Sequence, residues 1–125
     1  MDTTADIMEK IKNIPKNIRI GQQNKHILGT HEYRQYSELL NSKGEYGPSY
    51  ITGDLYFAKS LLDMYAGTGE FVIKNGKWLN IEKVLSSNTI GTVVNNLTGK
   101  EAQTCKFKIH YSVEGAHIVP DYMSK

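Results

Sequence analysis

A strict alternation of apolar and polar residues near the C-terminus constrains this fold more than any other feature. Four residues of the segment 104–111 fall on one face of a strand, namely Cys105, Phe107, Ile109 and Tyr111. The residues between them are Thr104, Lys106, Lys108 and His110. Because successive strand side chains point to opposite faces, the pattern predicts a sheet with one apolar and one cationic face. Cys105 is expected to be a buried thiol.

A short turn at residues 113–115 is expected to return the chain antiparallel and bring His117 close to His110. A sheet face that carries lysines and two histidines suits the handling of an anion and the transfer of protons. The alternative is that Lys106 and Lys108 are ordinary solvated strand residues and His110 is half-exposed without a function.

Three helices are predicted upstream of this sheet, over residues 2–14, 30–42 and 53–65. Thr30 and Thr52 are the expected N-caps of the second and third helices. Apolar residues recur at helical spacing in all three. The expected buried stripes are Ile7, Ile11 and Ile14; Tyr33, Tyr36, Leu39 and Leu40; and Leu55, Ala58, Leu61, Leu62, Met64 and Tyr65.

The period changes to two after residue 70. Asn75-Gly76 is a favoured two-residue turn and predicts a hairpin of 71–74 with 77–79. A further strand is expected over 89–95, and the turn 96–100 leads into the alternating segment. Helices followed by antiparallel strands predict an α+β fold. The N-terminal helices would pack on one face of a roughly four-stranded antiparallel sheet, and the face with lysines and histidines would stay open.

Length and composition fit one folded domain of 125 residues, with 39% hydrophobic and 22% charged residues. A net charge of only +2 excludes a general polycation, so any nucleic-acid site must arise from local charge. A single cysteine excludes an internal disulfide. No apolar run reaches the length of a membrane span, and no secretory signal is recognisable. We therefore expect synthesis in the cytoplasm and no membrane partner.

The segment 16–30 is locally basic and is expected to form a strand or an extended loop over the sheet. It holds Lys16, Arg19 and Lys25 without an acid. The ammonium of Lys25 disfavours protonation of the neighbouring His26 and would lower its pKa. The alternative is a polar loop with an incidental histidine. His31 is expected to be an exposed residue of the following helix.

Three chemistries could use four histidines. A metal site is disfavoured because neither His26 and His31 nor His110 and His117 have helical ligand spacing, so no metal ligand and no cofactor are predicted. Acyl transfer is disfavoured because Cys105 is expected to point into the core and no Gly-x-Ser-x-Gly motif is present. The Gly-Thr-Gly at 67–69 lacks the Lys-Ser/Thr pair of a phosphate loop.

Cleavage of RNA without a metal fits the residues best. The 2′-hydroxyl attacks its adjacent phosphate, which needs a base, an acid for the leaving 5′-oxygen, and cations around the phosphorane. The candidate residues, if they converge, are Lys25, His26, Lys108, His110, Ser112 and His117. Arg19 and Lys106 are candidate phosphate contacts, and Tyr50 or Tyr111 could stack a base. DNA cleavage is disfavoured because DNA lacks the 2′-hydroxyl.

Several motifs in order resemble the polymorphic toxin type 50 domain. They include Gly21-Gln-Gln-Asn-Lys-His-Ile-x-Gly29, Ser49-Tyr-Ile-Thr52, Tyr65-Ala-Gly-Thr-Gly-Glu70, Ile109-His-Tyr-Ser112 and Gly115-x-His-Ile-Val-Pro120. The resemblance implies a ribonuclease with the fold of barnase, EndoU, colicin ribonuclease and RelE toxins. It adds Ser49 and Thr52 to the candidate residues. Pro48 stands where the family suggests a basic residue, and His31 where it more often has asparagine.

The resulting prediction is a metal-independent endoribonuclease toxin domain, acting on RNA such as tRNA, with His26 and His110 or His117 as base and acid. Residues 1–20 are expected to be a linker helix from a longer toxin or phage protein, and 21–125 the monomeric ribonuclease domain. The resemblance implies interbacterial competition, action in the cytoplasm of a target cell and an acidic immunity protein. The alternative is a non-catalytic nucleic-acid- or protein-binding module of a phage structural protein.

Overall fold

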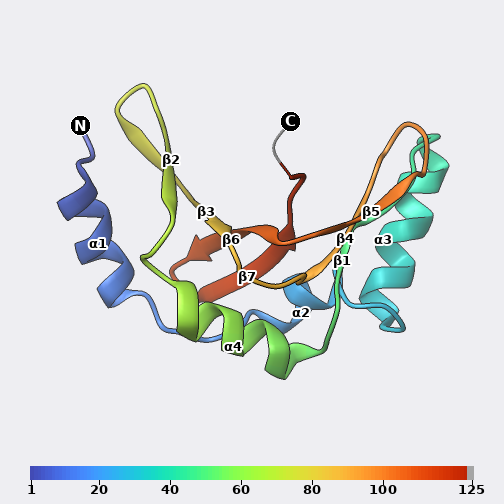
Figure 1. Cartoon of the computed structure of the whole chain (residues 1–125), viewed down its shortest axis with the longest axis horizontal. Coiled ribbons are helices and arrows are strands. Elements are labelled where there is room, and N and C mark those ends of the chain that lie inside the picture. The colour runs from blue at the N-terminus through green and yellow to red at the C-terminus, as the bar shows by residue number, and fades with distance from the viewer. Residues whose placement is uncertain (124–125) are drawn as a thin grey trace.

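Four helices and two antiparallel sheets form the described part of the chain, residues 1–123 of a computed structural model (Figure 1). The helices are α1 (Thr4–Asn13), α2 (Ile20–Asn24), α3 (His31–Ser42) and α4 (Leu55–Tyr65). The larger sheet contains β2 (Glu70–Lys74), β3 (Lys77–Leu85), β6 (Lys106–Ser112) and β7 (Gly115–Pro120) in that order. The smaller sheet contains β1 (Tyr50–Ile51), β4 (Gly91–Val94) and β5 (Glu101–Thr104). The predicted α+β fold is confirmed.

The alternation in β6 is confirmed residue by residue. Phe107, Ile109 and Tyr111 are buried, and the residues between them are half-buried. β6 pairs antiparallel with β7, and His110 lies directly opposite His117. Residues paired across a sheet share a face, so the two imidazoles lie side by side on the polar face as predicted.

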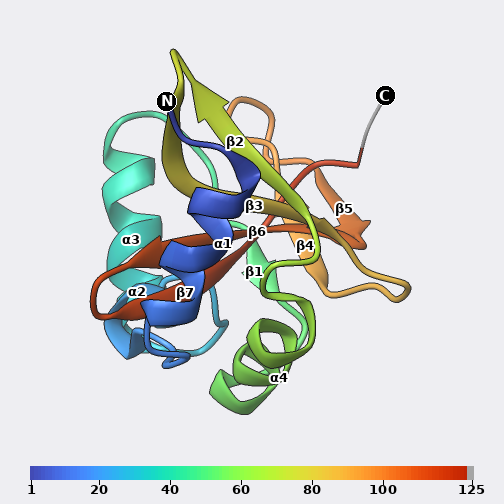
Figure 2. The ribbon, with the colours of Figure 1, turned by 90° about the vertical axis from the view of Figure 1, so that its left-hand side faces the viewer.

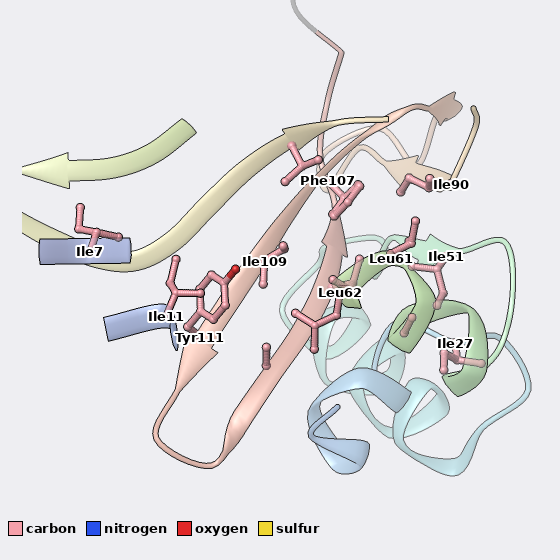
Figure 3. Close-up of a cluster of buried hydrophobic side chains, with 14 of the residues drawn as sticks. Ile7, Ile11, Ile27, Ile51, Leu61, Leu62, Ile90, Phe107, Ile109 and Tyr111 are labelled. Carbon is pink, nitrogen blue, oxygen red and sulfur yellow. The ribbon is translucent and has the colours of Figure 1, made fainter. Parts of the chain in front are cut away.

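The core lies between the helices and the apolar face of the larger sheet (Figure 3). Figure 1 shows α4 on one side of this sheet and the C-terminal segment leaving toward the other. Ile7 and Ile11 of α1 pack in the same core. The N-terminus lies beside the β2–β3 hairpin (Figure 2), where the backbone N–H of Trp78 donates to the Asp2 carboxylate at 2.8 Å. The domain boundary at residue 20 stays a prediction.

Two helical stripes were predicted too widely. Leu39 and Met64 are 51% and 66% exposed, so neither belongs to the buried stripe of its helix. The N-cap of α4 is Asp54, whose carboxylate accepts from the backbone N–H of Phe57 at 3.0 Å, and Thr52 precedes it. The N-cap of α3 is Thr30, as predicted.

The predicted continuous strand breaks at Cys105. The chain leaves the smaller sheet after Thr104 and enters the larger sheet at Lys106, so Cys105 forms the bend and its thiol is half-buried. The Thr104 hydroxyl accepts from the backbone N–H of Lys106 at 3.0 Å and donates to the carbonyl of Asp121 at 2.7 Å. These bonds fix the bend, which the alternation alone does not reveal.

The basic segment 16–30 was predicted to be a strand or an extended loop. Ile18 does form a single parallel bridge with Ala116 of β7, but Ile20–Asn24 form the short helix α2. Gln23 of this helix is fully buried. Its amide oxygen accepts from the Ile118 N–H at 2.6 Å and its amide nitrogen donates to the Ile118 carbonyl at 2.9 Å. The side chain thus satisfies the outer backbone groups of edge strand β7 and ties α2 to the residue after His117.

Replacing Gln23 with leucine is expected to lower the free energy of unfolding by roughly 2–4 kcal/mol, because two buried backbone groups of Ile118 lose their partners. Urea denaturation measures the change. Gln22→Leu is the matched control, since Gln22 is only half-buried and should stay within about 0.5 kcal/mol of the parent. Equal effects of the two substitutions would contradict this role of Gln23.

Candidate active site

Three histidines from separate segments form a row of imidazoles. His26 follows α2, His110 lies on β6 and His117 on β7. The ring centroids of His110 and His117 are 4.9 Å apart, and those of His26 and His117 are 6.3 Å apart. The rings are stacked, with interplanar angles of 21° and 10°. The structure therefore brings together the three histidines that the sequence proposed for proton transfer, with His117 in the middle.

The hydrogen bond of His26 determines its tautomer. Its Nδ1 lies 2.8 Å from the backbone carbonyl of Ser49. A carbonyl only accepts, so Nδ1 carries the proton and Nε2 keeps its lone pair in the neutral ring. A second hydrogen bond holds the residue after α2 against β1, since the Ile51 N–H donates to the His26 carbonyl at 2.8 Å. His26 is therefore held as a proton acceptor at Nε2.

Burial lowers the pKa of all three imidazoles. It is the largest cause for each, because a low-dielectric environment disfavours the charged ring. Lys108 further lowers the pKa of His110. Burial and the charges of His110, His26, Arg19 and Lys25 lower the pKa of His117 to about 3. The predicted effect of Lys25 on the pKa of His26 has the expected direction but is the smallest of its causes.

Stability is expected to fall as the pH falls from about 6.5 toward 3, because His117 has a pKa of about 3 when folded and 6.5 ordinarily. In that window the unfolded state binds more protons, and above it the difference vanishes. Asp2 and Asp6 contribute to the pH dependence of stability only below their ordinary pKa of 3.8. Backbone hydrogen bonds to Trp78 and Thr3 respectively lower their pKa values in the folded state. Urea denaturation across pH should show a slope that His117→Asn reduces by up to about 1.4 kcal/mol per pH unit.

The control for this pH effect is His31→Asn. His31 is exposed, as predicted, and its ring nitrogen lies 3.2 Å from a guanidinium nitrogen of Arg34. Comparison of this variant with His117→Asn separates the loss of a buried imidazole from the loss of an exposed one. A slope that is unchanged by His117→Asn would contradict the assigned burial of the neutral ring.

Of the predicted cations, Lys25, Lys108 and Arg19 lower the pKa values of histidines in the row. Lys25 Nζ lies over the Tyr36 ring, 5.6 Å from its centroid, and that ring meets His26 edge-on. Lys108 is half-buried on the same face as His110, and its Nζ lies 4.0 Å from Asp121. Arg19 pairs with the exposed Glu114 at 3.6 Å. Lys106 is half-buried at the start of β6.

The candidate hydroxyl groups differ in how close they lie to the imidazole row. Ser49 accepts from the Val94 N–H at 3.0 Å beside His26. The Ser112 hydroxyl donates to the Gly115 carbonyl at 3.2 Å and closes the β6–β7 turn. Thr52 is exposed at the end of β1. Tyr50 donates to the Glu101 carboxylate at 2.7 Å and stays half-buried.

Tyr111 is not available to stack a base. Its side chain is only 5% exposed, and its hydroxyl donates to buried Glu82 at 2.6 Å. The alternation placed this ring on the apolar face, and the structure shows that its core position excludes the base-stacking role that was also considered. Tyr111 is therefore a structural residue.

Two residues near the row were missed by the sequence reasoning. Lys83 pairs with Lys108 across β3 and β6 and so joins the cationic face. The prediction ended this strand at Leu79, because residues 81–84 (Ile-Glu-Lys-Val) do not alternate between apolar and polar and Glu82 is the residue that faces the core. Tyr36 was assigned to a buried stripe, yet its ring is half-buried beside His26 and Lys25.

Within residues 1–123, no group of three or more His, Cys, Asp or Glu side chains is placed to hold a metal ion. In the same range, no helix is long and apolar enough to cross a bilayer.

Comparison with known families gives the site its context. The model of the family described as bacterial toxin 50 matches residues 18–120. The chain belongs to the bacterial toxin 50 family. The matched range contains all three stacked histidines of this toxin 50 domain, and α1 precedes it. No curated protein and no solved structure gives a significant match.

Proposed function

We propose that this toxin domain is a metal-independent endoribonuclease. The observation that carries the proposal is the convergence of His26, His117 and His110 in one stacked row, with Lys108 beside it. Attack of the 2′-hydroxyl on the adjacent phosphate requires two proton transfers and the stabilisation of an anionic phosphorane. Imidazoles suit the proton transfers, and an ammonium group suits the anion.

In this proposal His26 is the general base. Nε2 of His26 takes the proton of the 2′-hydroxyl, because its Nδ1 proton is already bound to the Ser49 carbonyl. The 2′-oxygen then forms a bond to phosphorus. The lowered pKa of His26, caused chiefly by burial, keeps its ring neutral and ready to accept a proton at neutral pH.

His110 is the general acid in this proposal. It gives its proton to the 5′-oxygen as the P–O5′ bond breaks, which leaves a 2′,3′-cyclic phosphate and a 5′-hydroxyl. His110 suits this role better than His117 because burial and Lys108 lower its pKa, whereas burial, the two neighbouring imidazoles, Arg19 and Lys25 lower the pKa of His117 to about 3. A bound phosphate raises the pKa of a nearby imidazole and would load His110 with its proton.

The remaining candidate residues would stabilise the phosphorane or bind the RNA chain. Lys25 and Lys108 would stabilise the phosphorane, with Ser112 and Thr52 as orienting hydroxyls. Substrate contacts would come from Arg19, Ser49, Tyr50, Lys83 and Lys106. The biological role that fits is interbacterial competition, with the domain carried by a larger toxin or phage protein and neutralised by an immunity protein whose acidic surface covers the cationic face.

Incubation with single-stranded RNA in excess EDTA tests this function. We expect cleavage that leaves 2′,3′-cyclic phosphates and 5′-hydroxyls, because no step above needs a metal ion. The control is an oligonucleotide of the same sequence in which every nucleotide is 2′-deoxy, and it should stay intact. Products with 5′-phosphates, or cleavage of the DNA control, would contradict the mechanism.

A further inference from the structure

A small cavity lies against His26, which is at the opposite end of the imidazole row from His110. Its volume is about 160 Å³. It lies between α3, the segment before β1, the β4–β5 turn and β7. Besides His26 and Ser49, its lining residues are Tyr36, Leu40, Pro48, Val94, Asn96 and Val119.

The size and lining of the cavity suit a flat heterocycle. Pockets for drug-sized ligands measure about 300–1,000 Å³, so this smaller cavity suits a fragment such as a base, with the sugar and phosphate of the nucleotide outside it. Leu40, Pro48 and Val94 are buried and form an apolar wall. Tyr36 supplies an aromatic ring, the usual partner of an unstacked RNA base.

Two polar groups at the cavity are suited to read the edge of a base. Asn96 is exposed, and its amide offers both donors and an acceptor. The Ser49 hydroxyl accepts from the Val94 N–H and keeps its own proton to donate. The accessible lining of this cavity is more polar than apolar, so hydrogen bonds from these groups would determine which base is held.

We propose that this cavity binds the nucleobase on the 5′ side of the cleaved bond, and that Tyr36 and Asn96 determine which base is accepted. The inference rests on the proposed function. The base is attached to C1′ of the ribose and the attacking hydroxyl to the neighbouring C2′. A base seated against His26 therefore brings the 2′-hydroxyl of its own nucleotide to His26.

The other end of the row agrees with this polarity. Lys108 lies beside His110, and Lys83 is its partner across the sheet. The phosphates that follow the cleaved bond would run over these ammonium groups. The imidazole row thus has a base-binding end at His26 and a phosphate-binding end at His110.

Cleavage of an RNA pool with randomised sequence tests the assignment, with products identified by sequencing. The parent should prefer one base, or one class of base, on the 5′ side of the cut by about tenfold or more, the discrimination that one good amide–base contact supplies. Asn96→Ala should remove most of this preference while cleavage persists. The control is Asn41→Ala, an exposed asparagine on α3 outside the cavity lining, which should keep it. Cleavage without a 5′-side preference, or a preference that Asn96→Ala leaves intact, would overturn the proposal.

A binding experiment separates this inference from the proposed function. The four 2′-deoxynucleoside 3′-monophosphates cannot be cleaved, and their binding is followed by NMR at the methyl groups of Leu40 and Val94. Saturable shifts for the preferred base, weakened in Asn96→Ala and kept in Asn41→Ala, support the cavity even if RNA is not cleaved. The absence of shifts at millimolar concentration would overturn it even if RNA is cleaved.

Discussion

Replacing His26 with alanine is expected to lower kcat for RNA cleavage by ~10²–10⁴-fold, the usual contribution of one positioned acid–base group. Nε2 of this ring is the proposed proton acceptor, and the Ser49 carbonyl holds its tautomer. Since the ring lies beside the substrate rather than under its phosphates, KM should change much less than kcat. Steady-state kinetics on a fluorogenic RNA oligonucleotide measures both constants.

The matched control for this loss is His31→Ala. His31 lies five residues further along the chain, is exposed and lies outside the stacked row. Its removal should leave kcat within about twofold, as expected for a surface substitution. A His26→Ala enzyme that keeps its kcat, or a His31→Ala enzyme that loses as much, would show that the base has been assigned to the wrong residue.

Replacing Glu82 with alanine is expected to lower the free energy of unfolding by roughly 3–5 kcal/mol, because three donors lose a buried acceptor. Glu82 is fully buried on the apolar face of β3. Its carboxylate accepts from the Gly67 N–H at 3.0 Å, the Gly69 N–H at 2.6 Å and the Tyr111 hydroxyl at 2.6 Å. These bonds tie the end of α4 to the sheet, so their loss affects the whole fold.

Urea denaturation of Glu82→Ala beside Glu38→Ala checks this expectation. Glu38 is an exposed residue of α3, and its removal should cost less than about 0.5 kcal/mol. If Glu82→Ala alone fails to accumulate as folded protein, Glu82→Gln provides a measurable variant. It keeps the side-chain shape but directs an amide N–H toward one donor. Similar stabilities for the parent and both Glu82 variants would contradict the account.

The sheet and its polar face could be predicted because the information is local. Alternation over 104–111 determines which side chains share a face, and the Asn75-Gly76 turn determines a hairpin. Asn75 and Gly76 have φ values of 52° and 78°, as the predicted two-residue turn requires. The pairing of His110 with His117 follows from the short β6–β7 turn alone.

The approach of His26 to this pair could not be predicted from sequence patterns. It depends on α2 docking against β7 through the buried Gln23 amide, a contact between residues 95 positions apart. A buried glutamine carries no pattern that names its partner. The bend at Cys105 could not be predicted for a similar reason. It forms where the chain passes from the smaller sheet to the larger sheet, and no local pattern marks that passage.

The cleavage of a nucleoside 3′-(4-nitrophenyl phosphate) by the His26→Ala and His110→Ala variants tests the central claim most directly. Nitrophenolate leaves without a proton, so an enzyme that lacks only its general acid no longer needs one. We predict that His110→Ala regains nearly the kcat of the parent on this substrate, whereas His26→Ala stays slow because the 2′-hydroxyl must still lose its proton. Equal impairment of both variants on this substrate, or rescue of His26→Ala instead, would contradict the proposed division of roles.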